Sequence, residues 1–321
     1  MKFRLIFLAL GLLALSATIT GGAVYFQTVS TLVHDQARKT ALDSIEHLDK
    51  GISSILKTDQ RAVAVLAEMW SVQNFFNNKK TPETQTDIKF TLDDFREAYN
   101  ATRCCLLDRN GLVIAASAGE KSPVQIGDDY STRPFFKIAL EGESVTTLSQ
   151  GAISREPAVN LSHPVFSGNT VLGVALLSVP LADIGEIFAN STGIVALTDE
   201  HNIVFASNKP EWRFKLLGAT TAETLIDIAD DRLLLGEMPT QLPITFDKDI
   251  AHFPDGGKYL FSRSSLSSSP NWQINYFLEY GKIDASLHQA LSGKAGILLA
   301  VMAFFVLGAI GYLFRQAEVF L

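Results

Sequence analysis

The stretch "RCCLLDRNGLVIAAS" (Arg103–Ser117) decides the fold, because its two apolar runs flank a strong turn signal. The dipeptide Asn110-Gly111 between the runs predicts a tight hairpin of two antiparallel strands. The stretch "IVALTDEHNIVFAS" (Ile194–Ser207) repeats this pattern, and Asp199 takes the place of Asp108 before the second turn. Because the pattern occurs twice, about the length of a small domain apart, it predicts two similar small sheet domains in tandem, not a solenoid.

A second pair of strands is expected at the end of each repeat. In the first repeat "PAVNLSHPVF" (Pro157–Phe166) leads to "VLGVALLSV" (Val171–Val179), and in the second "GKYLFSRSSL" (Gly257–Leu266) leads to "NWQINYFLEY" (Asn271–Tyr280). Each half is therefore expected to be an antiparallel sheet with helical segments inserted between its strand pairs. The fold class predicted for the region that contains the two repeats is α+β.

The chain before the first repeat has the period of a helix, from about residue 29 to residue 76. Ile45, Leu48, Ile52 and Ile55 are spaced three, four and three residues apart, and Ala62, Leu66 and Met69 extend the same apolar seam. Such a seam is typical of a helix packed on its own domain, and equally of a coiled-coil stem that holds two chains together. Both interpretations stay open at this point.

Both ends of the chain are apolar enough to cross a membrane. Phe3–Phe26 carries one charge, Arg4, and Ala295–Phe314 carries none; roughly 20 apolar residues span a bilayer as a helix. The first segment also resembles a cleavable signal peptide, but its apolar run continues past the length of a signal core. Lys2 and Arg315 flank the two segments on their outer sides, which predicts both ends in the cytoplasm. The expected location is the bacterial inner membrane, with the region between the spans in the periplasm.

The domain organisation predicted from these patterns has six parts. They are a transmembrane helix at residues 1–28, a long stem helix at 29–78, a membrane-distal sheet domain at 79–190, a membrane-proximal sheet domain at 191–292, a second transmembrane helix at 293–315 and a cytoplasmic tail at 316–321. No kinase, cyclase or methyl-accepting region fits into the predicted tail.

Composition argues against several functions. The net charge of −7 disfavours a nucleic-acid partner. Cys104 and Cys105 are adjacent, so on a strand they point to opposite faces, and ordinary strand packing is expected for both. Neither a metal-type Cys/His spacing nor a Ser/His/Asp constellation stands out in the sequence. We therefore expect no enzyme activity, no cofactor and no metal.

Three stretches carry a resemblance to a known family. They are "YSTRPFFKIALEGE" (residues 130–143), "GAISREPAVNLSHPV" (151–165) and "TDEHNIVFASNKPEWRFKLLG" (198–218). Together with the order of anchor, helix, two sheets and second span, they resemble a double Cache sensor module, whose domains are PAS-like. The likeness is closest to the C4-dicarboxylate sensor histidine kinases of the DctB type, with the kinase part absent, and it covers roughly Val29–Ser292.

The resemblance implies a sensor that binds a small carboxylate in its distal domain and signals to an output absent from this chain. We expect a homodimer held together through the stem helix and the transmembrane helices. Two departures affect the expected ligand. The family usually has a lysine in the last distal strand, where this chain has Ser178, and Ala158-Val159-Asn160 replaces the family's Gly-Tyr-Tyr. Losing a cation and two phenols moves the expectation from a dianionic C4-dicarboxylate towards a monocarboxylate or a more neutral ligand.

Arg133 is the central candidate for ligand binding. Its planar fork of donors suits a carboxylate, and Tyr130, one helical turn earlier, can add a hydroxyl group. Phe136 and its neighbours would supply an apolar wall. The alternative is a surface ion pair between Arg133 and Asp128 or Asp129. Further candidate ligand contacts on the facing segments and strands are Ser149, Gly151, Ser154, Asn160 and Ser178.

Two classes of function remain open from the sequence. The first is ligand sensing, in which binding shifts the stem and the second span. The second is a ligand-free scaffold or assembly protein anchored in the membrane, since a fold alone does not imply a function. Trp212 and Trp272 lie in the proximal half, where core packing without ligand contact is expected.

Overall fold

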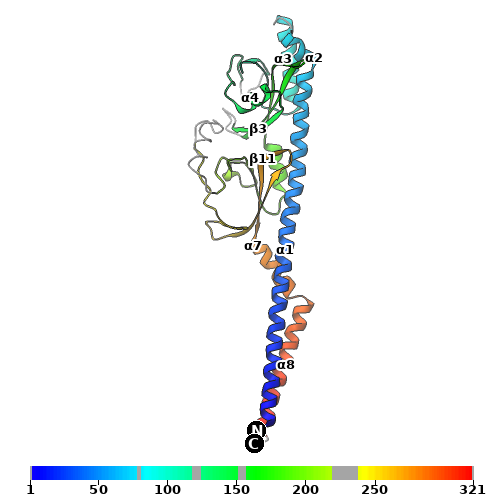
Figure 1. Cartoon of the computed structure of the whole chain (residues 1–321), viewed down its shortest axis with the longest axis vertical. Helices are drawn as coiled ribbons and strands as arrows, with labels where there is room; N and C mark the ends of the chain where they lie inside the picture. The colour runs from blue at the N-terminus through cyan, green and yellow to red at the C-terminus, as the bar shows by residue number, and fades with distance from the viewer. Residues whose placement is uncertain (1, 78–80, 118–123, 151–156, 219–237, 320–321) are drawn as a thin grey trace.

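One helix runs along most of the molecule and carries both sheets on its side (Figure 1). The computed structural model describes residues 2–77, 81–117, 124–150, 157–218 and 238–319. Helix α1 (Lys2–Glu68) is continuous over 67 residues, and it contains no proline that would interrupt its hydrogen bonds. The predicted stem is therefore one helix with the N-terminal apolar segment, and it ends at Glu68, where the separate helix α2 (Trp70–Asn77) follows.

The apolar seam of α1 packs inside its own chain. Ile45, Leu48, Ile52 and Leu66 are all buried, and Ile52 has no exposed surface. They belong to a core cluster that also contains residues of both sheets, such as Leu161. The first interpretation of the seam, packing on its own domain, is therefore confirmed for these residues.

The distal sheet, which lies farther from the chain termini, has five antiparallel strands in the order β2-β1-β5-β4-β3. Its strands are β1 (Arg103–Asp108), β2 (Val113–Ala116), β3 (Val145–Gln150), β4 (Pro157–Ser167) and β5 (Thr170–Pro180). One face packs on α1 and α3 (Pro82–Ala98). The other face packs on the short helix α4 (Pro134–Leu140) through Phe135 and Phe136.

The proximal sheet repeats this plan with six antiparallel strands in the order β7-β6-β11-β10-β9-β8. Its strands are β6 (Ile194–Thr198), β7 (Val204–Ser207), β8 (Thr245–Asp247), β9 (Ile250–His252), β10 (Lys258–Leu266) and β11 (Ser269–Glu279). Helix α5 (Ala182–Ala189) precedes the sheet, and the 3₁₀ turn η1 (Pro210–Trp212) follows β7. The α+β class, the long N-terminal helix and the two antiparallel sheets are thus confirmed.

The two predicted hairpins are closed by the same turn chemistry. The Asp108 carboxylate Oδ1 accepts the main-chain N–H groups two and four residues later, at 2.8 and 3.0 Å. The Asp199 Oδ1 accepts the equivalent pair at 3.0 and 2.8 Å. In each turn the third residue after the aspartate, Gly111 or Asn202, has a positive φ. A short acidic side chain that mimics a main-chain acceptor is the physical basis of the repeat.

Helix α3 was not predicted. Thr81 caps its first turn by accepting the N–H of Thr84, and Pro82 occupies the first helical position. Ile88 and Leu92, four residues apart, are buried against the core. The cap and the apolar spacing are both readable in the sequence.

The two ends of the chain lie together at one end of the molecule (Figure 1). Helices α7 (Tyr280–Leu291) and α8 (Lys294–Val319) follow the proximal sheet, and α8 runs beside the first part of α1. Among the described residues, the helical stretch Gly11–Glu68 contains a window apolar enough to span a membrane, whereas the apolar part of α8, Ala300–Tyr312, is shorter. The second transmembrane helix therefore stays a prediction.

Cys104 and Cys105 occupy opposite faces of β1, as expected. Cys104 packs in the cluster around α1, and Cys105 packs on the α4 side. Both thiols are free and buried. Burial raises the pKa of each thiol, that of Cys105 to about 12, so both are protonated at physiological pH.

Replacing Gly111 by alanine should destabilise the protein more than replacing Gly127. Both glycines have a positive φ, so each alanine costs about 1–2 kcal/mol of backbone strain. At Gly111 the added methyl would also lie 2.5 Å from main-chain atoms of Ser131, whereas Gly127 faces open space. Thermal and denaturant unfolding of the full chain in detergent measures the difference; equal losses for the two variants would contradict the close approach.

Candidate functional site

A row of side chains crosses the distal sheet on its α4 side. The strand register pairs Thr147 with Asn160, Asn160 with Ser178, and Ser178 with Arg103. Residues paired in this way point to the same face of a sheet. Strands β3, β4, β5 and β1 therefore each contribute one polar side chain to a single line.

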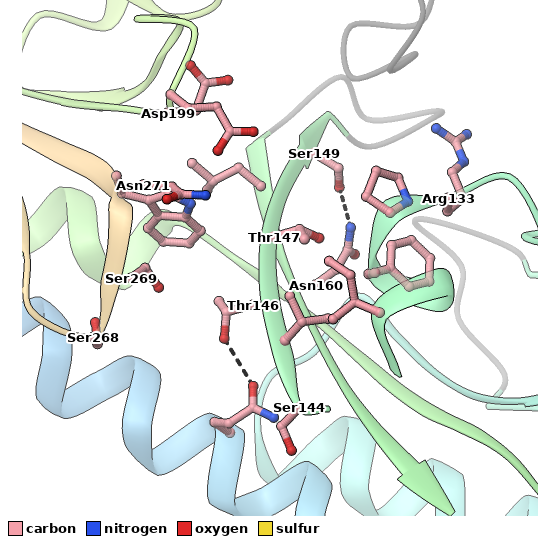
Figure 2. Close-up of a pocket in the computed structure, with 18 of the residues that line it drawn as sticks. Arg133, Ser144, Thr146, Thr147, Ser149, Asn160, Asp199, Ser268, Ser269 and Asn271 are labelled. Atoms are coloured by element: carbon pink, nitrogen blue, oxygen red, sulfur yellow. Dashed lines mark hydrogen bonds between the residues drawn. The ribbon is translucent and has the colours of Figure 1, made fainter. Parts of the chain in front are cut away.

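Two hydrogen bonds order the middle of this row. Ser178 Oγ donates to Asn160 Oδ1 at 2.6 Å, and Asn160 Nδ2 donates to Ser149 Oγ at 2.8 Å (Figure 2). Ser178 is fully buried and Asn160 is 2% exposed. Because the serine hydroxyl holds the amide oxygen, the amide nitrogen must face Ser149. Ser178, a predicted ligand contact, thus lies behind Asn160 and orients it.

Arg103 is the last residue of this row, and it was not among the ligand contacts predicted from the sequence. Its Nη1 donates to the Tyr130 hydroxyl oxygen at 3.3 Å, and its Nε is buried without a hydrogen-bond partner. Burial raises the pKa of Tyr130, and the nearby guanidinium only partly opposes this, so the phenol stays protonated. Arg103 stands directly opposite Ser178 in the β1–β5 register. A cation is therefore present one strand away from Ser178, the position where the resemblance led us to expect a lysine.

Arg133 stands immediately before helix α4, with an extended backbone. The helix begins at Pro134, so Tyr130 does not lie one helical turn earlier; a turn hydrogen bond from Arg133 N–H to Tyr130 O, at 3.0 Å, joins the two residues instead. In Figure 2 the Arg133 side chain extends away from the Ser149–Asn160 hydrogen bond. The Asp128 and Asp129 carboxylates accept main-chain N–H groups of their own loop.

These residues line a cavity of about 620 Å³ that reaches both sides of the edge strand β3. Gly151 and Ser154, two predicted contacts, lie outside the described residues. Phe136 of α4 packs in the core against the distal sheet and is not among the lining residues. On the α4 side the cavity is lined by Arg103, Tyr130, Arg133, Pro134, Phe135, Ile138, Val145, Thr147, Ser149 and Asn160.

The other side of β3 faces the proximal sheet and helix α1. Thr146 Oγ1 donates to Gln60 Oε1 of α1 at 3.0 Å, and Gln60 Nε2 donates to Ser162 O at 3.2 Å. Ser162 Oγ in turn donates to Phe135 O, in the first turn of α4, at 2.9 Å. Hydrogen bonds therefore connect the beginning of α4, through the sheet, to the long helix. The cavity on this side is lined by Gln60, Thr146, Leu148, Asp199, Glu200, Ser268, Ser269, Pro270, Asn271 and Trp272.

The two sides of the cavity differ in charge. The described charged groups on the α4 side are the guanidinium groups of Arg103 and Arg133, and those on the other side are the carboxyl groups of Asp199 and Glu200. The α4 side is therefore suited to an anion, with hydroxyl and amide donors beside the cations. No group of three or more His, Cys, Asp or Glu side chains among the described residues is arranged to hold a metal ion.

Trp212 and Trp272 both pack in the core, as expected for the proximal half. Trp212 contacts the rings of Phe253 and Phe277. Trp272 belongs to the cluster around α1, but it also lines the cavity. The expectation of core packing is confirmed for both, and the contact of Trp272 with the cavity was not foreseen.

Ser178→Ala should lower stability by about 1–3 kcal/mol, because the buried Asn160 Oδ1 would lose its donor. Ser167→Ala, at the exposed end of β4, is the matched control and should change stability by less than about 0.5 kcal/mol. Denaturant unfolding of the full chain in detergent measures both. If the two variants were equally stable, the hydroxyl of Ser178 would not be holding the amide.

Comparison with known proteins finds relatives of the chain as a whole. No protein-family model matches the chain. Over 237 residues, 71% of this chain, it is 25% identical to the C4-dicarboxylate transport sensor protein DctB of Rhizobium meliloti. The chain spans about 38% of the length of that relative.

Solved structures show the same architecture. The sensor domain of the Vibrio cholerae histidine kinase DctB matches with a TM-score of 0.67 and 18% identity, over 78% of this chain and 97% of that domain. The ligand-binding domain of the Campylobacter jejuni chemoreceptor Tlp3, in complex with L-valine, matches with a TM-score of 0.54 and 16% identity, over 80% of this chain and 98% of that domain. The chain is homologous to the DctB sensor proteins and has the Cache-type fold of their sensor domain.

Proposed function

We propose that this chain is the membrane-anchored input module of a bacterial receptor and that it binds a small organic acid on the α4 side of the distal sheet. The observation that carries the proposal is that two guanidinium groups, Arg103 and Arg133, line one cavity. The buried Nε of Arg103 has no hydrogen-bond partner, and guanidinium groups at a partly enclosed cavity favour an anionic ligand, since the cavity excludes part of the water that would solvate them.

The ligand class follows from the donors that line the α4 side. Arg103 with Tyr130 forms one pair of donors for a carboxylate, and Asn160 with Ser149 and Thr147 offers polar groups for the remainder of the ligand. The DctB relative is named for C4-dicarboxylate transport, and the Tlp3 domain was solved with L-valine. Both kinds of molecule carry a carboxylate, so the carboxylate is the part of the ligand that we assign to Arg103.

Arg103 also changes the expected charge of the ligand. The sequence lacks the family lysine at Ser178, which by itself favours a monocarboxylate. Because Arg103 is the cross-strand neighbour of that position, the site retains two cations, and a dicarboxylate is again compatible with it. We therefore propose an organic acid with one or two carboxylates, held by Arg103 at one end and reached by Arg133 at the other.

The proposed module lies in the inner membrane with its two sheet domains in the periplasm. We assign residues 79–190 to the distal ligand domain, 191–292 to the proximal domain, and α8 to a second span beside α1. The position of both chain ends at one end of the molecule supports this topology. In a homodimer, movement of α1 and α8 would pass the signal to a kinase, cyclase or chemotaxis protein.

A carboxylate ligand should stabilise the full chain, and removing either arginine should weaken binding by roughly 10–100-fold, as expected for hydrogen bonds to a charged group. We would screen succinate, shorter monocarboxylates and L-valine by thermal shift in detergent and confirm hits by calorimetry. At 100 times the dissociation constant, mass action gives about 2.7 kcal/mol of stabilisation. Arg103→Met and Arg133→Met are the test variants.

Arg109→Met is the matched control for these variants, because Arg109 is an exposed arginine in the turn after β1 of the same sheet. It should bind like the wild type. If Arg109→Met weakened ligand binding as much as the test variants do, the loss of affinity would come from the change in net charge and not from the two arginines of the cavity. If no organic acid stabilised the chain, the ligand-free scaffold would become the better description.

A C-terminal tag should be protected from protease added to intact spheroplasts, because Arg315 after the second apolar segment favours a cytoplasmic end. A protease site inserted near residue 80, in the region assigned to the periplasm, should be cut under the same conditions. Cleavage of the tag in intact spheroplasts would contradict the two-span topology.

A further inference from the structure

The turn that begins at Asp199 meets the distal domain across the cavity. Thr198, the last residue of β6, pairs with Gln273 of β11, so Asp199 and Trp272 follow at neighbouring strand ends. Both line the cavity together with Thr146 of β3. Figure 2 shows Asp199 and Asn271 on the side of β3 opposite the Ser149–Asn160 pair. The turn therefore lies at the cavity between the two sheet domains.

The Asp199 carboxyl group is only half satisfied. Its Oδ1 accepts the two N–H groups of the turn, but its Oδ2 is buried and has no hydrogen-bond partner. The whole side chain is 6% exposed. In the matching turn of the distal domain, Asp108 is half-exposed and its Oδ2 accepts a hydrogen bond from the Asn110 amide. The same turn thus occurs in two environments, and a buried, unpartnered carboxylate oxygen occurs in the one that faces the other domain.

We propose that the Asp199 turn is a proton-controlled contact between the two sheet domains. When the carboxyl group is neutral, the turn stays packed in the cleft between the domains. When it is ionised, the cleft opens so that water reaches Oδ2. This regulation would act on the cavity of the proposed ligand site, so its role in sensing rests on that function, whereas the proton-controlled contact itself does not.

The charged groups around Asp199 do not neutralise it in the closed cleft. Glu200 and His201 belong to the same turn, and the His201 Nε2 lies 3.9 Å from the Glu200 carboxylate. The groups that α1, β3 and the β10–β11 turn bring to this side of the cavity are uncharged: Gln60, Thr146, Leu148, Ser268, Ser269, Pro270, Asn271 and Trp272. Of the cations that line the cavity within the described residues, Arg103 and Arg133 both lie on the α4 side of β3.

The direction of the pH effect follows from the cost of burying the charge. Burial raises the pKa of Asp199 from 3.8 to about 7, opposed by its hydrogen bond with the Ile203 N–H and by His201. An open, hydrated turn would return the pKa towards 3.8. The closed contact therefore binds the proton more tightly, so its proton-linked stabilisation is complete below pH 3.8 and is lost progressively as the pH rises from there to about 7.

Trp272 provides a direct measurement of the opening, because it lines the cleft and is buried. We would replace Trp70 and Trp212 by phenylalanine in the full chain and measure acrylamide quenching in detergent, without ligand, from pH 5 to pH 9. Quenching of Trp272 should increase severalfold as the pH rises from 5 to about 7 and should then level off. Asp199→Asn, which keeps an acceptor for the turn but cannot ionise, should stay weakly quenched at every pH.

Two control variants separate Asp199 from other groups. Asp108→Asn makes the same change in the half-exposed turn and should follow the wild type. His201→Gln should keep the transition; its loss in that variant would assign the effect to the imidazole and overturn the proposal. A transition that persists in Asp199→Asn, or equal quenching of the parent chain at pH 5 and pH 9, would also overturn it.

Hydrogen exchange gives a second measurement that needs no substitution. In the unmodified chain, the amides of His201 and Ile203 should exchange faster above pH 7 than intrinsic rates predict, whereas the equivalent amides of Asn110 and Leu112 should not. Protection of both turns that is equal across this range would contradict the proposal. Since neither experiment contains ligand, failure of carboxylate binding would leave their results unchanged.

Discussion

The packing of both sheets on a single helix is the constraint on which the rest of this structure depends. One core cluster contains Ile52 of α1, Leu161 of the distal sheet and Ile274 of the proximal sheet. Burial of this shared apolar surface is the main stabilising contribution, and it orients each sheet with one face towards α1. The opposite faces are left to smaller clusters, and strand β3 of the distal sheet lines a cavity together with the β10–β11 turn of the proximal sheet. The cavity around β3 exists because two sheets on one straight support leave a gap where their loops approach.

The two sheets differ on the faces that point away from α1. This difference explains why that face of the distal sheet is the better candidate for a ligand site. On the proximal sheet the outer face is filled by aromatic rings around Phe277, and Arg263 is held by the Asn275 side-chain oxygen at 2.9 Å. On the distal sheet the corresponding face carries a polar row that ends in a guanidinium with a buried Nε lacking a partner. A polar row of this kind costs desolvation free energy in an empty site, and hydrogen bonds to a ligand would offset that cost.

The features that the sequence predicted are those set by local chemistry. The two hairpins follow from an aspartate and a positive-φ residue within five positions, and the period of the stem follows from residues a few positions apart. Arg103 was missed because its place in the site depends on the pairing of β1 with β5, which joins distant parts of the chain. The position of Ser178 in its strand was readable, but its hydrogen bond to Asn160 of the neighbouring strand was not; its contact with a ligand stays a prediction. The helical relation of Tyr130 to Arg133 failed because the helix begins only at Pro134.

The same dependence on distant pairing determines how the site is connected to helix α1. Phe135 O, in the first turn of α4, accepts from the Ser162 hydroxyl, and Ser162 O accepts from Gln60 of α1. Ser162 has no exposed surface, so breaking either bond would leave a buried polar group unsatisfied, at a cost of about 1–3 kcal/mol. A displacement of the first turn of α4, next to Arg133, must therefore strain this chain of bonds or move Gln60 with it. Helix α1 is continuous from Gln60 to the N-terminal apolar segment. A displacement of the helix at Gln60 would therefore be transmitted to that segment without a break in the helix.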